Sequence, residues 1–346
     1  MCYGGVGFVL KNSMGNGQKI VVTGGAGFIG SHLVERLLSE GHQVTVIDDL
    51  STGRLSNLST ARDNPNLKIY TSKVSKCVEL EQVVSSADYI FHLAAAVGVE
   101  LVLKNPVRAI ETNLIETEVL LNTARKYNTS ILIASTSEVY GKSKAEAFSE
   151  IDDLLIGPPH LIRWSYACSK LMDEFLAMSH STESGLPVTV VRIFNTVGPR
   201  QTGRYGMVLP RFIACAIVGK PLTVFGDGLQ GRCFCNVFDT VEALTRLMRC
   251  DKAKNEIFNV GSDYEITILD LAKLVIRVLN SNSTIEIVPY ERAYPKGFED
   301  MQRRKPVISK LASFTGFRPK YSLEETILQT ADAIKRNNIS IEIGEI

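Results

Sequence analysis

The sequence predicts an α/β protein with a doubly wound parallel sheet and a smaller mixed α/β lobe toward the carboxyl end. Residues 20–48 read as one strand, turn, helix and strand unit, and apolar strands keep alternating with amphipathic helices to about residue 195. Beyond that point, segments punctuated by glycine and proline replace the alternation. We therefore predict a loose N-terminal extension over residues 1–18, a sheet domain over 19–195 and a lobe over 196–346, with elements of the last two interleaved.

The first unit has the pattern of a dinucleotide-binding site. After the β-branched strand 20–22, the turn Thr23–Gly30 carries three spaced glycines. One permits the tight turn, one lets backbone NH groups approach a pyrophosphate, and one lets the helix lie close to the strand. The helix, residues 31–39, would direct the positive end of its dipole at the phosphates. The residues predicted to contact the cofactor here are Gly24, Gly27, Phe28, Ile29 and Gly30.

The second strand of this unit, 44–48, ends in an acidic residue that completes the Rossmann pattern. Asp48 stands about 20 residues after the glycine-rich turn, where the adenosine ribose of a dinucleotide is expected. A carboxylate there accepts hydrogen bonds from the ribose hydroxyls and repels a 2′-phosphate, which favours NAD over NADP. Arg54 nearby would suit a phosphate. An ordinary strand-to-helix turn is the alternative for the glycines alone, and the strand, helix and acid around them favour NAD binding.

Composition excludes several classes of function. The chain has 38 basic and 37 acidic residues and no basic block, which argues against nucleic acid or an anionic membrane as the main partner. No apolar run reaches the 18 or so residues of a membrane-spanning helix. The seven scattered cysteines indicate free thiols in a cytoplasmic protein. Cys233 and Cys235 lack a second pair of ligands, so we predict no metal site and expect both to be buried strand residues.

Two later strands end in residues suited to a ligand site. The strand 89–93 runs into small residues that allow a cofactor to approach the carboxyl edge of the sheet, and its His92 is expected to be packed and hydrogen-bonded. The strand 131–134 opens into hydroxyl groups and Glu138. The remaining cofactor contacts are predicted at Leu93, Ala94 and Ala95. Further elements are expected near 67–70, 78–85, 106–127 and 222–225, with a helix from 164 and a closing helix from 322.

A tyrosine and a lysine lie four residues apart at the start of the helix expected from residue 164. At this spacing Tyr166 and Lys170 share one helix face, and a neighbouring ammonium would lower the pKa of the phenol toward that of a general base. The ammonium could also bind a nicotinamide ribose. Alone, such a pair is common on solvated helices. Its order after the glycine-rich turn and the Ser/Thr cluster favours catalysis.

Five stretches together resemble the extended short-chain dehydrogenase/reductase family of nucleotide-sugar enzymes. The resemblance extends over about residues 19–335 and implies NAD as cofactor, a UDP-sugar as substrate and a homodimer built on a four-helix bundle. It also implies substrate contacts at Asn195, Arg204, Arg232 and Arg304. Ser72–Lys76 departs from the family pattern, which usually has an aspartate there for the adenine amino group. The five stretches are 23–30, 92–95, 135–141, 166–170 and 192–200.

The same resemblance implies a first step in which carbon 4 of the sugar gives a hydride to NAD. Tyr166 would take the hydroxyl proton, assisted by Thr136 or Ser137, with Lys170 beside it. The pair Ser137–Glu138 resembles UDP-glucuronate decarboxylases, as do Trp164 and the run 297–306. The alternatives are a UDP-glucose or UDP-uronate 4-epimerase, a nucleotide-sugar dehydratase and a non-catalytic NAD-sensing protein. The catalytic residues predicted are Tyr166, Lys170, Thr136, Ser137 and Glu138.

Overall fold

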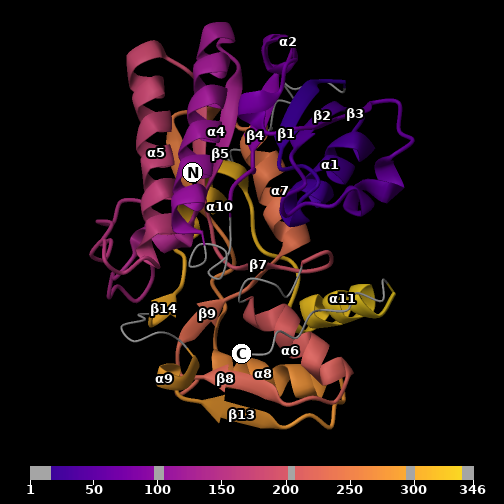
Figure 1. The fold of residues 1–346 in the computed structure, drawn as a ribbon, viewed down its shortest axis with the longest axis vertical. Helices are drawn as coiled ribbons and strands as arrows, with labels where there is room; N and C mark the ends of the chain where they lie inside the picture. The colour runs from indigo at the N-terminus through magenta and orange to yellow at the C-terminus, as the bar shows by residue number, and fades with distance from the viewer. Residues whose placement is uncertain (1–16, 97–104, 202–206, 294–300, 337–346) are drawn as a thin grey trace, which may run out of the picture.

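The computed structural model describes residues 17–96, 105–201, 207–293 and 301–336 (Figure 1). Some of the sequence predictions fall on the remaining residues. The proposed substrate contact Arg204 and the first four residues of the run 297–306 lie outside the described residues. Almost all of the expected N-terminal extension lies outside them too.

A parallel sheet of seven strands forms the centre of the described chain, in the order β11-β6-β5-β4-β1-β2-β3. Every neighbouring pair in it is parallel. The doubly wound Rossmann sheet predicted from the sequence is therefore confirmed, and its order reverses between β1 and β4, where such sheets bind ligands. The strands are β1 (Lys19–Thr23), β2 (Gln43–Asp48), β3 (Leu67–Thr71), β4 (Tyr89–His92), β5 (Ser130–Thr136), β6 (Val188–Ile193) and β11 (Glu256–Val260).

Helices cover both faces of this sheet. On one face α1 (Phe28–Ser39), α7 (Val237–Met248) and α10 (Ser309–Thr315) share an apolar core with the strands. On the other face the core includes α2 (Leu80–Ser85), and α4 (Pro106–Tyr127) and α5 (Trp164–Ser184) lie side by side (Figure 1). None of the described helices is both long and apolar enough to cross a bilayer. Short 3₁₀ helices form η1 (Leu55–Ala61), η2 (Val74–Lys76), η3 (Ser137–Tyr140) and η5 (Asp251–Ala253).

The smaller lobe lies beyond the carboxyl ends of the large sheet (Figure 1). Its core joins three helices to β8, which pairs in parallel with β13. A three-stranded sheet, in the order β12-β9-β14, lies between this core and the large sheet. The elements are β7 (Thr196–Val197), α6 (Val208–Ile217), β8 (Leu222–Phe225), β9 (Gly231–Cys233), β10 (Cys235–Asn236), β12 (Glu265–Thr267), α8 (Ile268–Val278), β13 (Ile285–Val288), α9 (Tyr290–Ala293), β14 (Arg303–Arg304) and α11 (Leu323–Arg336).

Two element boundaries differ from the sequence prediction for physical reasons. Helix α1 begins at Phe28, three residues earlier than expected, so the last glycine of the turn lies inside the helix. A Cβ atom on that residue, Gly30, would lie 2.1 Å from the carbonyl oxygen of Gly24, which requires glycine there. Strand β5 extends two residues further than expected because its pairing with β6 continues to Thr136 and Ile193.

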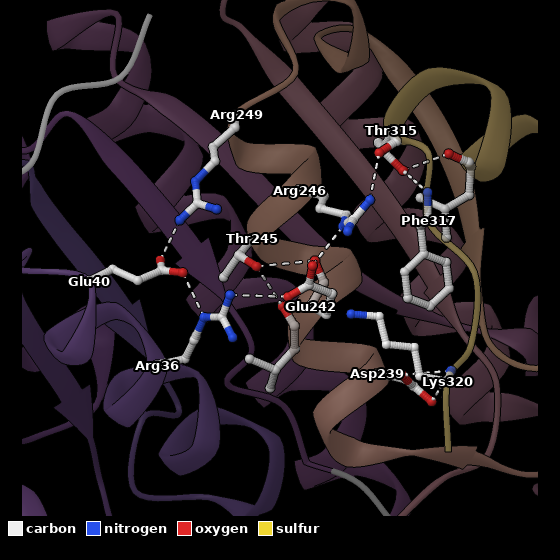
Figure 2. A network of polar contacts seen from close by, with 12 residues as sticks. Arg36, Glu40, Asp239, Glu242, Thr245, Arg246, Arg249, Thr315, Phe317 and Lys320 are labelled. Carbon is white, nitrogen blue, oxygen red and sulfur yellow. Dashed lines mark hydrogen bonds and ion pairs between the residues drawn. The ribbon is translucent and has the colours of Figure 1, made fainter. Parts of the chain in front are cut away.

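A polar network ties the C-terminal half of the chain to α1 (Figure 2). Arg36 of α1 bonds Glu242 of α7 at 3.1 Å, and Arg246 joins the same glutamate to the carbonyl of Thr315. Asp239, also on α7, accepts the backbone NH groups of Lys320 and Tyr321 at 3.0–3.1 Å. The segment between α10 and α11 is thus fixed to the sheet domain before the chain enters the lobe again.

Candidate active site

The glycine-rich turn lies against the end of β4, where the strand order reverses. Gly24 has a left-handed backbone (φ 72°), and a Cβ atom on it would lie 2.8 Å from the nitrogen of Ala94. Position 24 therefore requires glycine, because the backbone that follows β4 lies too close for a side chain. Gly27 is the N-cap of α1 and makes no side-chain cap, so the first turn of the helix suits an anion. Phe28 and Ile29 lie in this turn, and their contact with a pyrophosphate stays a prediction.

Asp48 lies at the end of β2 and is bonded to the glycine-rich turn. Its two carboxylate oxygens accept the backbone NH groups of Ala26 at 2.9 Å and Leu50 at 2.8 Å. Burial raises the pKa of the carboxyl group, and these two hydrogen bonds oppose the rise. Asp48 therefore holds the turn in place. The carboxylate is close to the turn that would carry the phosphates, as a ribose contact requires.

His92 is buried at the end of β4 and does not face the ligand site. Its Nδ1 lies 2.7 Å from the hydroxyl of Thr23, and its Nε2 lies 3.0 Å from the hydroxyl of Thr117. Burial lowers the pKa of His92 to about 3, so the ring is neutral at physiological pH. This packed and hydrogen-bonded histidine agrees with the expectation. The following residues, Leu93 and Ala94, donate their NH groups to Thr23 and so fix the strand end.

Tyr166 lies in the first turn of α5 beside the end of β5. The hydroxyl that hydrogen-bonds to it is that of Thr136, whereas the side chain of Ser137 is buried. The pKa of Tyr166 is raised, first by burial and then by the negative charges of Glu138 and Asp173. The Thr136 hydroxyl and the charge of Arg304 act in the opposite direction. The phenol is consequently protonated at neutral pH in this structure.

Lys170 is paired with a buried carboxylate. Its ammonium donates to Asp173 Oδ2 at 2.6 Å, and both side chains are buried. A carboxylate this close offsets the positive charge that the phenol would otherwise feel. The pKa of Tyr166 is raised in this structure, whereas the sequence predicted that Lys170 lowers it. Sequence reasoning missed Asp173, although its i+3 position places it one helical turn after Lys170.

Glu138 lies between two arginines that come from distant parts of the chain. Arg163 Nη1 is 3.1 Å from Glu138 Oε2, and Arg304 Nη2 is 3.4 Å from Glu138 Oε1. The glutamate follows β5, Arg163 precedes α5, and Arg304 ends β14 of the lobe. Their side chains are 5–13% exposed, so the two ion pairs are shielded from most solvent. The structure thus brings the predicted residues Glu138 and Arg304 together and adds Arg163.

Two other predicted substrate contacts are among the described residues. Arg232 is the register partner of Arg304 in the β9–β14 pair, and its Nη1 donates to the carbonyl of Gly231. Asn195 follows β6, and its side-chain amide donates to the carbonyl of Cys233 at 3.0 Å. Asn195 therefore links β9 to the end of the large sheet. Among the described cysteines, Cys233 and Cys235 are buried free thiols.

Comparison with known proteins identifies the family. Residues 20–261 match the model of the NAD dependent epimerase/dehydratase family, which is more than half of the chain. The chain belongs to this family. The prediction of an enzyme of this type is therefore confirmed, and the epimerase/dehydratase family is the extended short-chain dehydrogenase/reductase type that the sequence motifs resemble.

Curated and structural relatives of this epimerase/dehydratase family member cover nearly all of its length. A UDP-N-acetyl-alpha-D-glucosaminuronate decarboxylase of Bacillus cytotoxicus is 41% identical over 90% of this chain and 96% of the relative. UDP-glucuronic acid decarboxylase 2 of Arabidopsis thaliana is 38% identical over 89% of this chain and 66% of its own length. The structure of UDP-glucuronic acid 4-epimerase from Bacillus cereus, with UDP-glucuronic acid and NAD, has a TM-score of 0.82 and 28% identity over 92% of this chain and 99% of that one.

Sequence reasoning on this family member missed one arginine of the site. As substrate contacts it considered only the arginines beyond residue 200. Arg163 directly precedes Trp164, over whose ring its guanidinium lies at 4.9 Å, and it comes three residues before Tyr166. The sequence could have indicated Arg163 through its position about one helical turn before the expected base.

Proposed function

We propose that this family member is an NAD-dependent decarboxylase of a UDP-uronic acid that works through a 4-keto-sugar intermediate. The observation that carries the proposal is the position of Glu138 between Arg163 and Arg304, beside Tyr166 at the carboxyl edge of the sheet. Guanidinium groups bind carboxylates and phosphates, so this cluster suits a substrate that is itself a carboxylate. The names of the two decarboxylase relatives support the same class of substrate.

The described residues fit NAD as the cofactor. The uncapped N-terminus of α1 at Gly27 would hold the pyrophosphate, Asp48 the adenosine ribose, and Ala94 and Ala95 would let the cofactor approach. Bound NAD would accept the hydride from carbon 4 of the sugar. We propose that Lys170 lies beside the nicotinamide ribose, from the helix turn that also carries Tyr166.

Residues of the chain carry out the proton transfers and assist the decarboxylation. Tyr166, once ionised to the phenolate, takes the proton of the 4-hydroxyl while Thr136 orients its oxygen. The ketone formed at carbon 4 allows the bond between carbon 5 and the carboxylate to break, because the electron pair left behind is delocalised into the ketone as an enolate. Carbon dioxide leaves, and carbon 5 then takes up a proton that Glu138 relays from solvent. We assign the diphosphate to arginines of the lobe, including Arg232 and Arg204.

A UDP-uronate 4-epimerase is the second candidate. It is favoured by the likeness to the Bacillus cereus epimerase, whose structure contains UDP-glucuronic acid and NAD. Both reactions begin with the same oxidation of carbon 4. They differ in carbon balance, because the epimerase returns the hydride to the ketone and retains the carboxylate.

The deciding experiment follows the carboxyl carbon. The protein is incubated with NAD and, separately, with UDP-glucuronate and UDP-N-acetylglucosaminuronate labelled with ¹³C at carbon 6, and with UDP-glucose. We expect labelled carbon dioxide and a UDP-pentose from one or both uronates, detected by mass spectrometry and NMR, and no product from UDP-glucose. A UDP-uronate epimer that retains all its label would instead establish the second candidate.

Asp48 leads to a prediction about the cofactor. NAD is expected to bind at least tenfold more tightly than NADP, because the Asp48 carboxylate lies where a 2′-phosphate would bring a second negative charge. Calorimetric titration of both cofactors measures the ratio. Asp48→Asn should reduce it, whereas Asp49→Asn, an exposed neighbour, should not. Equal affinities in the wild type would contradict the assignment.

We also propose a homodimer in which α4 and α5 pair with the same helices of a second copy. These neighbouring helices expose large apolar side chains, with Ile115 46%, Met172 51% and Phe175 62% exposed. Phe175→Asp is therefore expected to convert a dimer into a monomer, as measured by sedimentation. Leu229→Asp is the matched control, because Leu229 is equally exposed (65%) but lies in the lobe. A monomeric wild type would refute the proposal.

A further inference from the structure

His92, Lys170 and Asp173 form a group of buried ionisable side chains, and the proposed reaction gives a task only to Lys170. Asp173 is fully buried, and Lys170 is 1% exposed. A carboxylate and an ammonium cost several kcal/mol each to remove from water unless they are paired, so a buried pair of this kind needs an explanation. The two side chains are in contact at 2.6 Å.

The surroundings leave Lys170 as the cation that acts on Asp173. On the α4 side the hydroxyl of Thr117 faces Asp173, and behind it His92 of β4 is neutral. On α5 itself Glu174 adjoins Asp173, but its carboxylate is bound by Arg192 of β6 at 2.8 Å. The charges of Lys170 and Asp173 therefore nearly cancel. The pair lies on α5, the helix that also carries Tyr166.

Three charged groups act on Tyr166. Glu138 of η3 and Asp173 of α5 raise its pKa, and Arg304 of β14 lowers it. Of these groups Asp173 is the one that also determines how much positive charge Lys170 presents to the phenol. A carboxylate that binds the ammonium weakens the support that the ammonium gives to a phenolate.

We infer that Asp173 is a positioning residue that draws Lys170 away from Tyr166 and thereby determines the pH range over which Tyr166 can take the substrate proton. The inference rests on the proposed function only in that Tyr166 is the base. Asp173 has two effects. It binds the buried ammonium, and its own negative charge opposes formation of the phenolate at Tyr166.

The test is the pH dependence of the oxidation step in Asp173→Asn. Bound NAD is reduced by the uronate in a single turnover, followed at 340 nm from pH 5 to 10. Removing the negative charge is expected to move the acid limb of the profile to lower pH by about one unit. An alkaline limb should move down as well, because a buried ammonium without its partner loses its proton more easily. If Asp173 were only structural, its replacement would lower the rate at every pH and leave both limbs at the pH of the wild type.

Two variants serve as controls, and a third is an alternative test if Asp173→Asn does not fold. Asp173→Glu retains the charge and should restore limbs close to those of the wild type. Asp239→Asn removes another buried carboxylate, the one bound to the backbone of Lys320 and Tyr321 (Figure 2), and should shift neither limb. If Asp173→Asn does not fold, Thr117→Val removes the hydroxyl that lowers the pKa of Asp173 and should shift the acid limb in the same direction by less.

A measurement without substrate separates this inference from the proposed function. The protein is labelled with [ζ-¹³C]tyrosine, and the Tyr166 signal is assigned by its loss in Tyr166→Phe. The signal is then titrated in the wild type and in Asp173→Asn. Ionisation at lower pH in the variant supports the inference even if no UDP-uronate reacts. An unchanged or higher midpoint, or unmoved limbs in the kinetic profile, would overturn it.

Discussion

Tyr166→Phe is expected to abolish the reduction of bound NAD by a UDP-uronate. The phenol is the group that takes the 4-hydroxyl proton, and loss of one general base typically costs about a hundred- to ten-thousand-fold in rate. The residue touches Thr136 and faces Glu138, while the groups assigned to the diphosphate lie on the lobe. Binding of the nucleotide sugar should therefore remain within about threefold of the wild type, so the loss falls on kcat.

Stopped-flow absorbance at 340 nm measures the oxidation, and calorimetry with UDP measures binding. Tyr264→Phe is the matched control, because Tyr264 is 62% exposed and lies in the lobe. It should retain wild-type rates. Near-normal turnover in Tyr166→Phe would place the base elsewhere, and loss of UDP binding as well would mean that the phenol anchors the substrate.

Glu138→Gln is expected to separate decarboxylation from oxidation. The substitution keeps the shape of the side chain but removes the charge that binds Arg163 and Arg304. The two guanidinium groups would then hold the substrate carboxylate more strongly, and the relay of a proton to carbon 5 through Glu138 would be lost. Release of carbon dioxide should fall by about a hundredfold or more, whereas the reduction of NAD should fall less.

The measurement compares labelled carbon dioxide with NADH formed in the same reaction. Glu265→Gln is the matched control, because Glu265 pairs with Arg303 at 2.9 Å, one residue from the cluster on the same small sheet. It should leave the ratio unchanged. If both products fall equally in Glu138→Gln, the glutamate serves the oxidation step, and if no carbon is ever lost, the epimerase candidate stands.

The elements that bear the cofactor site could be predicted because their signals are local. A glycine-rich turn between a β-branched run and an amphipathic helix identifies β1 and α1, and an acid at the end of the next strand identifies Asp48. The start of α1 was predicted three residues late, because Gly30 was read as part of the turn. Its glycine is required by contact with the carbonyl of Gly24 and not by the backbone angle.

The electrostatics of the site could not be predicted from spacing. Tyr166 and Lys170 share a helix face, but spacing does not show which group the ammonium binds. In the structure it binds Asp173 at 2.6 Å. The pairing of Glu138 with Arg304 joins residues 166 positions apart and depends on how the lobe folds over the sheet. Contacts of this kind require the tertiary structure.

The last strand of the large sheet has a consequence for synthesis of the chain. Strand β11 pairs with β6 along its whole length, from Glu256 beside Thr189 to Val260 beside Ile193, yet it is made more than 60 residues later. Helix α7, which covers the same sheet beside α1, also comes from that interval. A nascent chain that has just emerged to residue 195 therefore presents an open strand edge and an uncovered apolar face. The sheet domain therefore cannot complete its folding before β11 and α7 have been synthesised. A chaperone would be needed while residues 196–260 are being made.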